Sequence, residues 1–353
     1  MKHLILFFNG ENNMKKQIIA AAVAASVSAV AMADISISGN ANYEWFSTTT
    51  GSANANYTTD TEINLNIRGK NGDTTVVADI EIDSHGDDAS TAIDVEDTYI
   101  TTKVGDVSVK AGNFSSGTSA LGGEIDAGGR ATNKLSLSTN MAGWTVGFAQ
   151  NDNTTTSNVD SDSSSISAEG KIGDVSVRLK EASDTATYVG LSGTLAGINY
   201  RIDNKDADAA NSDVLFVDVS TKVGGATVGY SVLDADSAGK ITEGDSSLFG
   251  LSINHVDSTT ITAGTSGTAS ARGNVATGAS QLRVSAPMAG NTLSAKIGTI
   301  EDGLGAGSDL DFTELKLTRA LASGATLNIV YDDYDNSTSA STEVIEIDLS
   351  VKF

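Results

Sequence analysis

The chain ends in Ile345-Glu346-Ile347-Asp348-Leu349-Ser350-Val351-Lys352-Phe353, and this stretch decides the fold class. Apolar residues occupy every second position up to the terminal phenylalanine, and polar or charged residues stand between them. Successive side chains of a β-strand point to opposite faces. The stretch therefore predicts a strand with one apolar face and one polar face, ending on an aromatic ring.

The same period of two recurs upstream, in residues 62–68, 107–110, 134–138 and 175–180. In the repeating unit, a strand of about ten residues is followed by a tight turn rich in Gly, Asn and Asp, which adopt positive φ at low cost. A second strand and a longer polar connection then follow. Short turns alternating with longer connections are typical of the periplasmic turns and extracellular loops of outer-membrane barrels.

The rhythm predicts nine hairpins, with a first strand at 35–46 and a last strand at 342–353. The hairpins cover residues 61–84, 94–113, 131–151, 164–181, 185–204, 211–235, 245–268, 279–300 and 309–334. The best count is therefore about 20 strands, within the even-numbered range of such barrels, and an even number puts both termini on one side of the membrane.

The first 33 residues differ from the rest. Lys15 and Lys16 precede an apolar, alanine-rich run, and Ala31-Met32-Ala33 supplies a small-x-small cleavage site. This order is typical of a secretory signal peptide over 1–33, with 34–353 as the barrel domain. The segment before Met14 fits either a start assigned too early, with Met14 the first residue, or an unusually long signal.

Composition narrows the class of protein. The chain has no cysteine, only one proline and a formal net charge of -23. Without cysteine there is no disulfide framework, and a scarcity of proline suits a sheet. The acidic excess argues against nucleic acid as a partner and favours cations.

After Ala33 no apolar run approaches the roughly 18 residues of a membrane helix. A closed barrel is the other structure that satisfies every backbone group in lipid. A soluble sandwich also shows alternation, but so many strands with none apolar on both faces leave no second layer to cover them. A repeat solenoid is disfavoured because no unit recurs with fixed side chains.

Residues 98–114, the C-terminal Val351-Lys352-Phe353 and the opening residues 34–40 resemble the general bacterial outer-membrane porin family. The resemblance implies an all-β, transmembrane, antiparallel up-and-down barrel of 16–20 strands in the Gram-negative outer membrane. Two departures stand out: Asn113 occupies a position where the family often has arginine, and the family usually has 16 strands. The resemblance also implies a homotrimer, contact with the lipid bilayer and lipopolysaccharide, and recognition of Phe353 by the barrel-assembly machinery.

Selectivity in a pore comes from rings of charge and from a narrow point. The alternation puts a set of charged residues on the polar, pore-lining face: Arg68, Lys110, Lys134, Arg178, Lys180, Arg201, Arg283, Lys296, Glu44, Asp79, Glu81, Asp83 and Glu169. By resemblance, the loop from Ser115 to Ala131 folds inward as a constriction carrying Glu124, Asp126 and Arg130. The alternatives are that each charge is simply solvated or paired on the wall, and that the loop is an ordinary exposed one.

No residue pattern supports an enzyme, a metal site or a cofactor. The sequence has no Gly-x-Ser-x-Gly elbow, phosphate-binding loop or His-Glu-x-x-His motif. Aspartate-rich stretches such as 152–163 and 203–213 lack the spacing of a calcium loop. We therefore expect a porin for passive diffusion of small hydrophilic solutes and ions, with a mild preference for cations. The alternatives are a secreted surface-layer or adhesin-like protein and, less favoured, a barrel enzyme.

Overall fold

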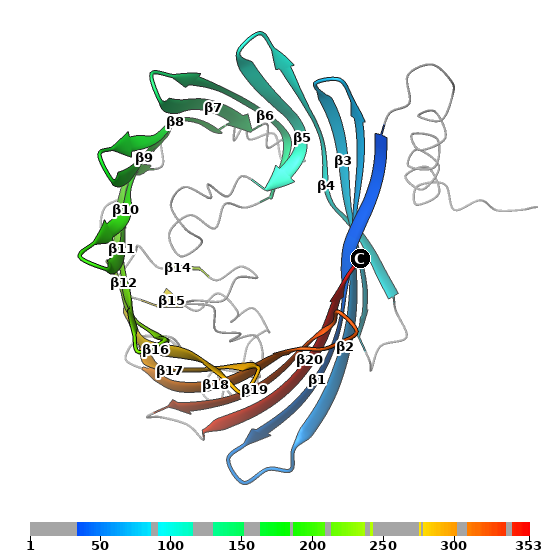
Figure 1. The fold of residues 1–353 in the computed structure, drawn as a ribbon, viewed down its shortest axis with the longest axis vertical. Coiled ribbons are helices and arrows are strands. Elements are labelled where there is room, and N and C mark those ends of the chain that lie inside the picture. Colours follow the sequence, from blue (N-terminus) through cyan, green and yellow to red (C-terminus); the bar gives the residue numbers. More distant parts are fainter. Residues whose placement is uncertain are drawn as a thin grey trace, which may run out of the picture.

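The computed structural model describes residues 34–85, 91–115, 130–151, 163–183, 186–208, 213–236, 241–242, 275–276, 278–301, 309–336 and 341–353. These residues form a closed antiparallel β-barrel of 18 strands, seen along its axis in Figure 1. The described ranges contain no helix long and apolar enough to cross a membrane.

The first half of the barrel is built from ten strands. They are β1 (Asp34–Thr50), β2 (Asn56–Asn71), β3 (Thr74–His85), β4 (Thr91–Val104), β5 (Val107–Ser115), β6 (Arg130–Met141), β7 (Trp144–Asn151), β8 (Ser163–Ile172), β9 (Val175–Ala182) and β10 (Ala186–Leu195). The second half contributes β11 (Ile198–Ala207), β12 (Val214–Val223), β13 (Ala226–Ala235), β16 (Gly278–Met288), β17 (Asn291–Glu301), β18 (Leu310–Ala320), β19 (Thr326–Asn336) and β20 (Thr342–Lys352). A separate two-stranded pair joins β14 (Ile241–Thr242) to β15 (Val275–Ala276).

Every barrel strand pairs with the barrel strands before and after it, and β1 pairs with β20 to close the ring. Closure leaves no sheet edge with unpaired backbone groups, which is the condition for crossing a bilayer. The predicted up-and-down topology is therefore confirmed.

The best count of 20 strands is corrected to 18, a value inside the predicted range. The hairpin expected at 245–268 lies outside the described residues. Its expected neighbours, β13 and β16, hydrogen-bond directly to each other over Thr227–Asp234 and Gly278–Ser285, so no strand pair stands between them in the wall. The overcount arose because a period of two in the sequence does not show which strands pair with each other in the wall.

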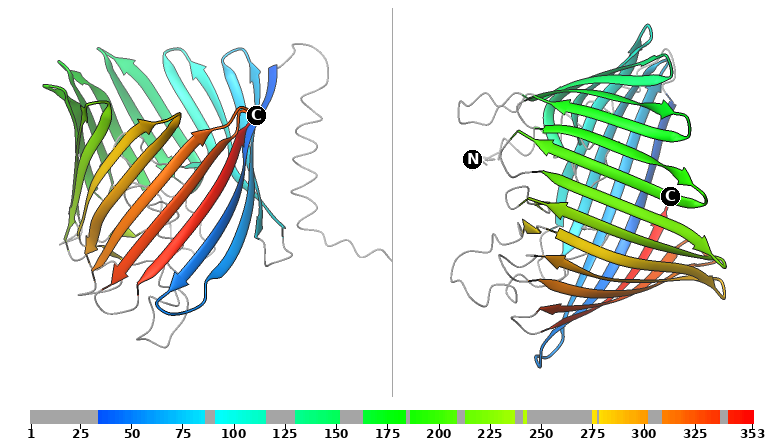
Figure 2. Two further views of the ribbon diagram at one scale, coloured as in Figure 1. Left: turned by 60° about the horizontal axis from the view of Figure 1, so that its bottom comes forward. Right: turned by 90° about the vertical axis from the view of Figure 1, so that its left-hand side faces the viewer.

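The two rims of the barrel differ, as Figure 2 shows. At the turn rim, most strands are joined by two residues, as at Gly72-Asp73, Gly105-Asp106 and Gly173-Asp174, and the C-terminus lies there. At the opposite, loop rim the connections are longer, apart from the three residues between β9 and β10. This asymmetry matches the predicted alternation of short turns and longer loops.

The register assigns side chains to two faces. Cross-strand partners share a face, so Ile37 lies beside Ile67 and Leu137 beside Phe148 on one of them. This face carries the exposed large apolar residues, including Ile37 and Leu195 at 63% and 72% exposure. The buried charged residues Lys134, Asp203 and Asp332 lie on the other face. Because the concave side of a closed barrel is the more enclosed, the charged face is the inner one.

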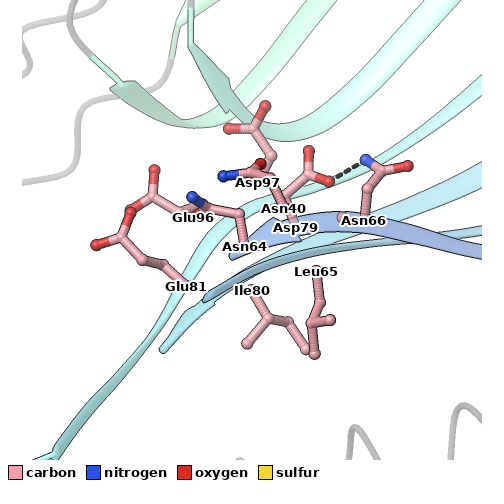
Figure 3. A pocket seen from close by; sticks show the side chains of 10 residues that line it. Asn40, Asn64, Leu65, Asn66, Asp79, Ile80, Glu81, Glu96 and Asp97 are labelled. Atoms are coloured by element: carbon pink, nitrogen blue, oxygen red, sulfur yellow. Dashed lines mark hydrogen bonds between the residues drawn. The ribbon is translucent and has the colours of Figure 1, made fainter. Parts of the chain in front are cut away.

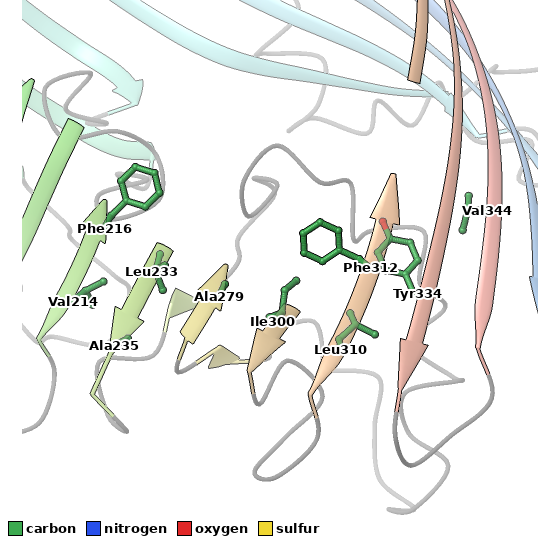
Figure 4. Packing of buried hydrophobic residues seen from close by; sticks show 10 residues of the cluster. All are labelled: Val214, Phe216, Leu233, Ala235, Ala279, Ile300, Leu310, Phe312, Tyr334 and Val344. Atoms are coloured by element: carbon green, nitrogen blue, oxygen red, sulfur yellow. The ribbon is translucent and has the colours of Figure 1, made fainter. Parts of the chain in front are cut away.

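The inner face is not polar along its full height. Near the loop rim it carries a cluster of buried apolar side chains from β12 to β20, drawn in Figure 4: Val214, Phe216, Leu233, Ala235, Ala279, Ile300, Leu310, Phe312, Tyr334 and Val344. The expectation that no strand is apolar on both faces is therefore wrong at the loop-rim end of β12. In β12, Val214 and Phe216 face inward while Leu215 and Val217 face outward.

Candidate channel lumen

The register puts all of the predicted pore-lining residues on the inner face. Glu44 pairs with Asp348 across the β1–β20 seam, Lys110 with Ser136, and Arg283 with Lys296. Whether any of these side chains contacts a passing solute stays a prediction. The register does show how acidic and basic side chains are distributed around the inner wall.

Acidic side chains gather on β20 and β1–β4. We call this set the acidic arc: Glu44, Glu62, Asp79, Glu81, Asp83, Asp97, Glu346 and Asp348. Asp79, Glu81 and Asp97 of this arc and the neighbouring Glu96 line a recess of about 290 Å³ together with Asn40, Asn64 and Asn66. Figure 3 shows these acidic and amide side chains on one side of the sheet, with Leu65 and Ile80 pointing away on the other.

A β-bulge enriches this recess in carboxylates. The β3–β4 register shifts between Ala78 and Ile80, so that two residues of β4, Glu96 and Asp97, stand opposite Asp79. A bulge commonly re-aims a side chain beside a functional site. A polar chain also crosses the arc: Arg68 Nε donates to Asn66 Oδ1 at 2.6 Å, and the Asn66 amide donates to Asp79.

Basic side chains dominate the inner face from β5 to β17. We call this set the basic arc: Lys110, Lys134, Arg178, Lys180, Arg201, Arg283 and Lys296. Strands β9–β12 of this arc stand across the barrel from β1–β4 in Figure 1. The inner wall thus carries opposite charge on two facing sides.

Four members of the basic arc are paired with carboxylates on the wall. Arg283 Nη1 lies 2.6 Å from Asp218 Oδ1, and Lys296 Nζ lies 3.0 Å from Glu314 Oε2. Arg201 Nε lies 2.5 Å from Asp203 Oδ2, and Arg178 Nε lies 3.5 Å from Glu169 Oε1. Wall pairing, one of the alternatives for these charges, therefore holds for four of them.

The other three members of the arc, all lysines, stand over aromatic rings. Lys110 Nζ lies 3.8 Å from the ring centroid of Tyr99 and 4.0 Å from that of Phe114. Lys134 Nζ lies 4.9 Å from the Phe114 centroid. Lys180 Nζ has the same 4.9 Å separation from Tyr188. Cation–π attraction fixes each ammonium against the wall while keeping its charge.

The predicted constriction is only partly placed. Glu124 and Asp126 lie outside the described residues. Arg130 is the first residue of β6, and its backbone pairs with Ser115 at the end of β5. It therefore belongs to the wall at the foot of the connection rather than to the connection itself.

Sequence reasoning missed three inner carboxylates, Asp203, Glu314 and Asp332, which are at most 5% exposed. Glu314 and Asp332 stand directly opposite each other on β18 and β19. The period of two was the signal available for them: Asp203 follows Arg201 by two residues, and Glu314 precedes Lys316 by two. No group of three or more potential metal-ligating side chains occurs within the described ranges.

A closed 18-stranded barrel with an apolar outer face and a charged inner face is the architecture of transmembrane β-barrels such as porins. No family model matches the chain, and no curated protein matches it either. Solved structures do match. Pseudomonas aeruginosa OpdL superposes with a TM-score of 0.65 at 13% identity, covering 91% of this chain and 99% of that one.

Two further P. aeruginosa structures show the same fold. OccK3 (OpdO) has a TM-score of 0.62 at 13% identity, covering 91% of this chain and 96% of that one. OccK2 (OpdF) in complex with glucuronate has a TM-score of 0.60 at 13% identity, covering 91% and 98%. The chain has the fold of Gram-negative outer-membrane porins.

Proposed function

We propose that the chain is a passive, water-filled channel for small hydrophilic solutes and ions, with a mild preference for cations. The observation that carries this proposal is the division of the closed barrel's inner wall into an acidic arc and a basic arc on facing sides. Charges of opposite sign across a lumen create a transverse field, which orients dipolar solutes and disfavours apolar ones.

The proposed cation preference rests on how many charged groups of each arc are paired with an opposite charge on the wall. Four basic groups of the basic arc are already matched by wall carboxylates, which lowers the net positive field on that side. The strands of the acidic arc carry fewer basic residues, namely Arg68 and, near the turn rim, Lys70, Lys103 and Lys352. Its recess between β1 and β4 therefore offers a negative path along the wall.

The remaining parts of the proposal rest on the fold. A channel needs no catalytic group, and we propose no enzymatic activity. We further propose that three copies assemble in the bilayer beside lipopolysaccharide, after insertion by the barrel-assembly machinery, and that nucleic acid is not a partner.

The test is conductance of the purified protein in a planar lipid bilayer separated by a KCl gradient. We expect discrete, ohmic current steps and a reversal potential of the sign given by cation permeation. Absence of current steps would contradict the channel itself. Current steps with a reversal potential of the anion sign would contradict the cation preference and leave the channel standing.

A further inference from the structure

The barrel closes where β1 and β20, its first and last strands in the chain, pair with each other. At the end of the β1–β20 seam, Gly39 N donates to Phe353 O at 2.9 Å and Phe353 N donates to Gly39 O at 3.0 Å. Gly39 and Phe353 thus form a hydrogen-bonded cross-strand pair, one step beyond the pairing of Asn40 with Lys352. Side chains of such a pair share one face of the sheet.

The phenyl ring of Phe353 occupies the place of the side chain that Gly39 lacks. A Cβ built on Gly39 would lie 2.9 Å from Phe353 Cζ and 3.2 Å from Cε2. Gly39 faces outward, beside Leu65 of β2, so the ring crosses the outer surface of β1. Phe353 is still 58% exposed, so the ring lies on the surface rather than in a core.

Ring-over-glycine contacts also occur inside the wall, where they join strands that are already connected. Gly170 of β8 lies under the Trp144 ring of β7, and Gly298 of β17 under the Phe312 ring of β18. The Gly39–Phe353 contact instead joins the first strand to the last. No connection holds β1 near β20, so closing this seam costs the most loop entropy in the barrel.

We propose that Gly39 is the seat of the C-terminal ring, and that docking of Phe353 on it locks the closed barrel. Phe353 then acts in the folded protein as well as serving as an assembly signal, and Gly39 is its positioning residue. A side chain at position 39 would displace the ring and leave the seam held by backbone hydrogen bonds alone. The inference is independent of ion selectivity and of the solute.

The test is a double-mutant cycle on protein refolded from urea into lipid vesicles that contain no assembly machinery. Gly39→Ala, Phe353→Ala and the double variant are followed by the unboiled gel mobility of the folded barrel. We expect Phe353→Ala to raise the unfolding rate in urea roughly fivefold, the size of one lost aromatic contact. We expect Gly39→Ala to act much more weakly in the Phe353→Ala background than in the wild type.

The double-mutant cycle separates the loss of the contact between Gly39 and the Phe353 ring from a second effect of Gly39→Ala. A Cβ on Gly39 also comes within 2.1 Å of the Asn64 carbonyl oxygen, a clash that does not depend on the ring. Equal effects of Gly39→Ala in both backgrounds would assign its cost to Asn64 and overturn the proposal.

If Gly39→Ala does not fold, Phe353→Ala alone still tests the proposal. Val351→Ala, on the same outward face of β20 and opposite Ala41, is the matched control for loss of apolar surface. We expect it to change the unfolding rate less than Phe353→Ala does. A Phe353→Ala barrel that unfolds at the wild-type rate, or no faster than Val351→Ala, would limit Phe353 to recognition during assembly.

Discussion

Arg283 illustrates, at the scale of one residue, how the inner wall holds a charge. Its guanidinium donates to Asp218 Oδ2 at 2.9 Å and to Ser231 Oγ at 2.6 Å, while Ser231 donates to Asp218 Oδ1 at 2.6 Å. Gly229, directly opposite Arg283, leaves the room for this: a Cβ there would lie 2.6 Å from the guanidinium carbon. The three groups form a closed network between β12, β13 and β16.

Replacing Arg283 should destabilise the barrel, because Asp218 loses its counter-ion and keeps only the hydroxyl donor of the buried Ser231. We expect Arg283→Met to lower the free energy of unfolding by about 1–2 kcal/mol, a value reduced for the partial exposure of the pair. Urea unfolding in detergent micelles measures the change. Arg319→Met, at the exposed turn rim, is the control and should stay within about 0.5 kcal/mol. Equal effects of the two variants would show that the network adds no stability.

The sequence was least informative about the pairing and burial of individual side chains. Alternation puts Arg283 and Asp218 on one face, but it cannot say that they pair, because they lie on strands separated in the wall by β13. The buried carboxylates Asp203 and Asp332 were missed for a related reason. Their burial depends on what surrounds them in three dimensions, and a two-residue period carries no information about that.

At the scale of elements, the two-residue turns give the hairpins their geometry. Ala142, Ala196 and Ala289 have φ of 52°, 51° and 51°, and each is followed by a glycine with positive φ. Two consecutive positive φ values define a type I′ turn, whose twist matches that of the flanking strands. Alanine occupies the first position at a steric cost that glycine avoids.

Glycine at these first positions should therefore stabilise the barrel. We expect Ala142→Gly to raise the free energy of unfolding by up to about 1 kcal/mol, because relief of the left-handed strain exceeds the added chain entropy of the unfolded state. The control is Ala149→Gly in the interior of β7, which should lose about 0.5–1 kcal/mol. If the urea midpoints of the two variants shifted in the same direction, this explanation of the turns would be wrong.

Elements were the scale at which the sequence was most informative. Each of the nine expected hairpins rests on one signal, a tight turn rich in Gly, Asn or Asp between strands of period two, and the turn at Gly105-Asp106 is a clear example. The strand count failed because β13 and β16 pair directly, a long-range contact that local residues do not encode. The expectation of one apolar face per strand also failed at the loop-rim end of β12, where apolar residues occupy both faces.

At the scale of the whole molecule, the two arcs make the lumen electrically asymmetric. The chain's net charge of -23 suggested cation preference, but it did not reveal that the acids gather on β20 and β1–β4 while the bases gather on β5–β17. That segregation depends on the order of strands around the ring. It became visible only once the register was known.

Neutralising part of the acidic arc should weaken cation preference. We expect the combined variant Asp79→Asn and Glu81→Gln to lower the cation-to-anion permeability ratio roughly twofold, the effect of removing about 0.4 kcal/mol of screened attraction. Reversal potentials in a KCl gradient give the ratio. Asp106→Asn, in a turn outside the lumen, is the control and should leave it unchanged. A ratio that rises, or that changes equally in the control, would contradict a selective role for the recess.

The central claim is that the closed barrel encloses a water-filled path through the outer membrane. Swelling of liposomes that contain the purified protein, placed in isotonic solutions of small neutral sugars, tests it most directly, because only solute passage through the lumen lets water follow. The account predicts swelling whose rate falls as the sugar grows larger, while protein-free liposomes do not swell. Liposomes that contain folded, heat-modifiable barrel and still fail to swell in the smallest sugar would contradict it.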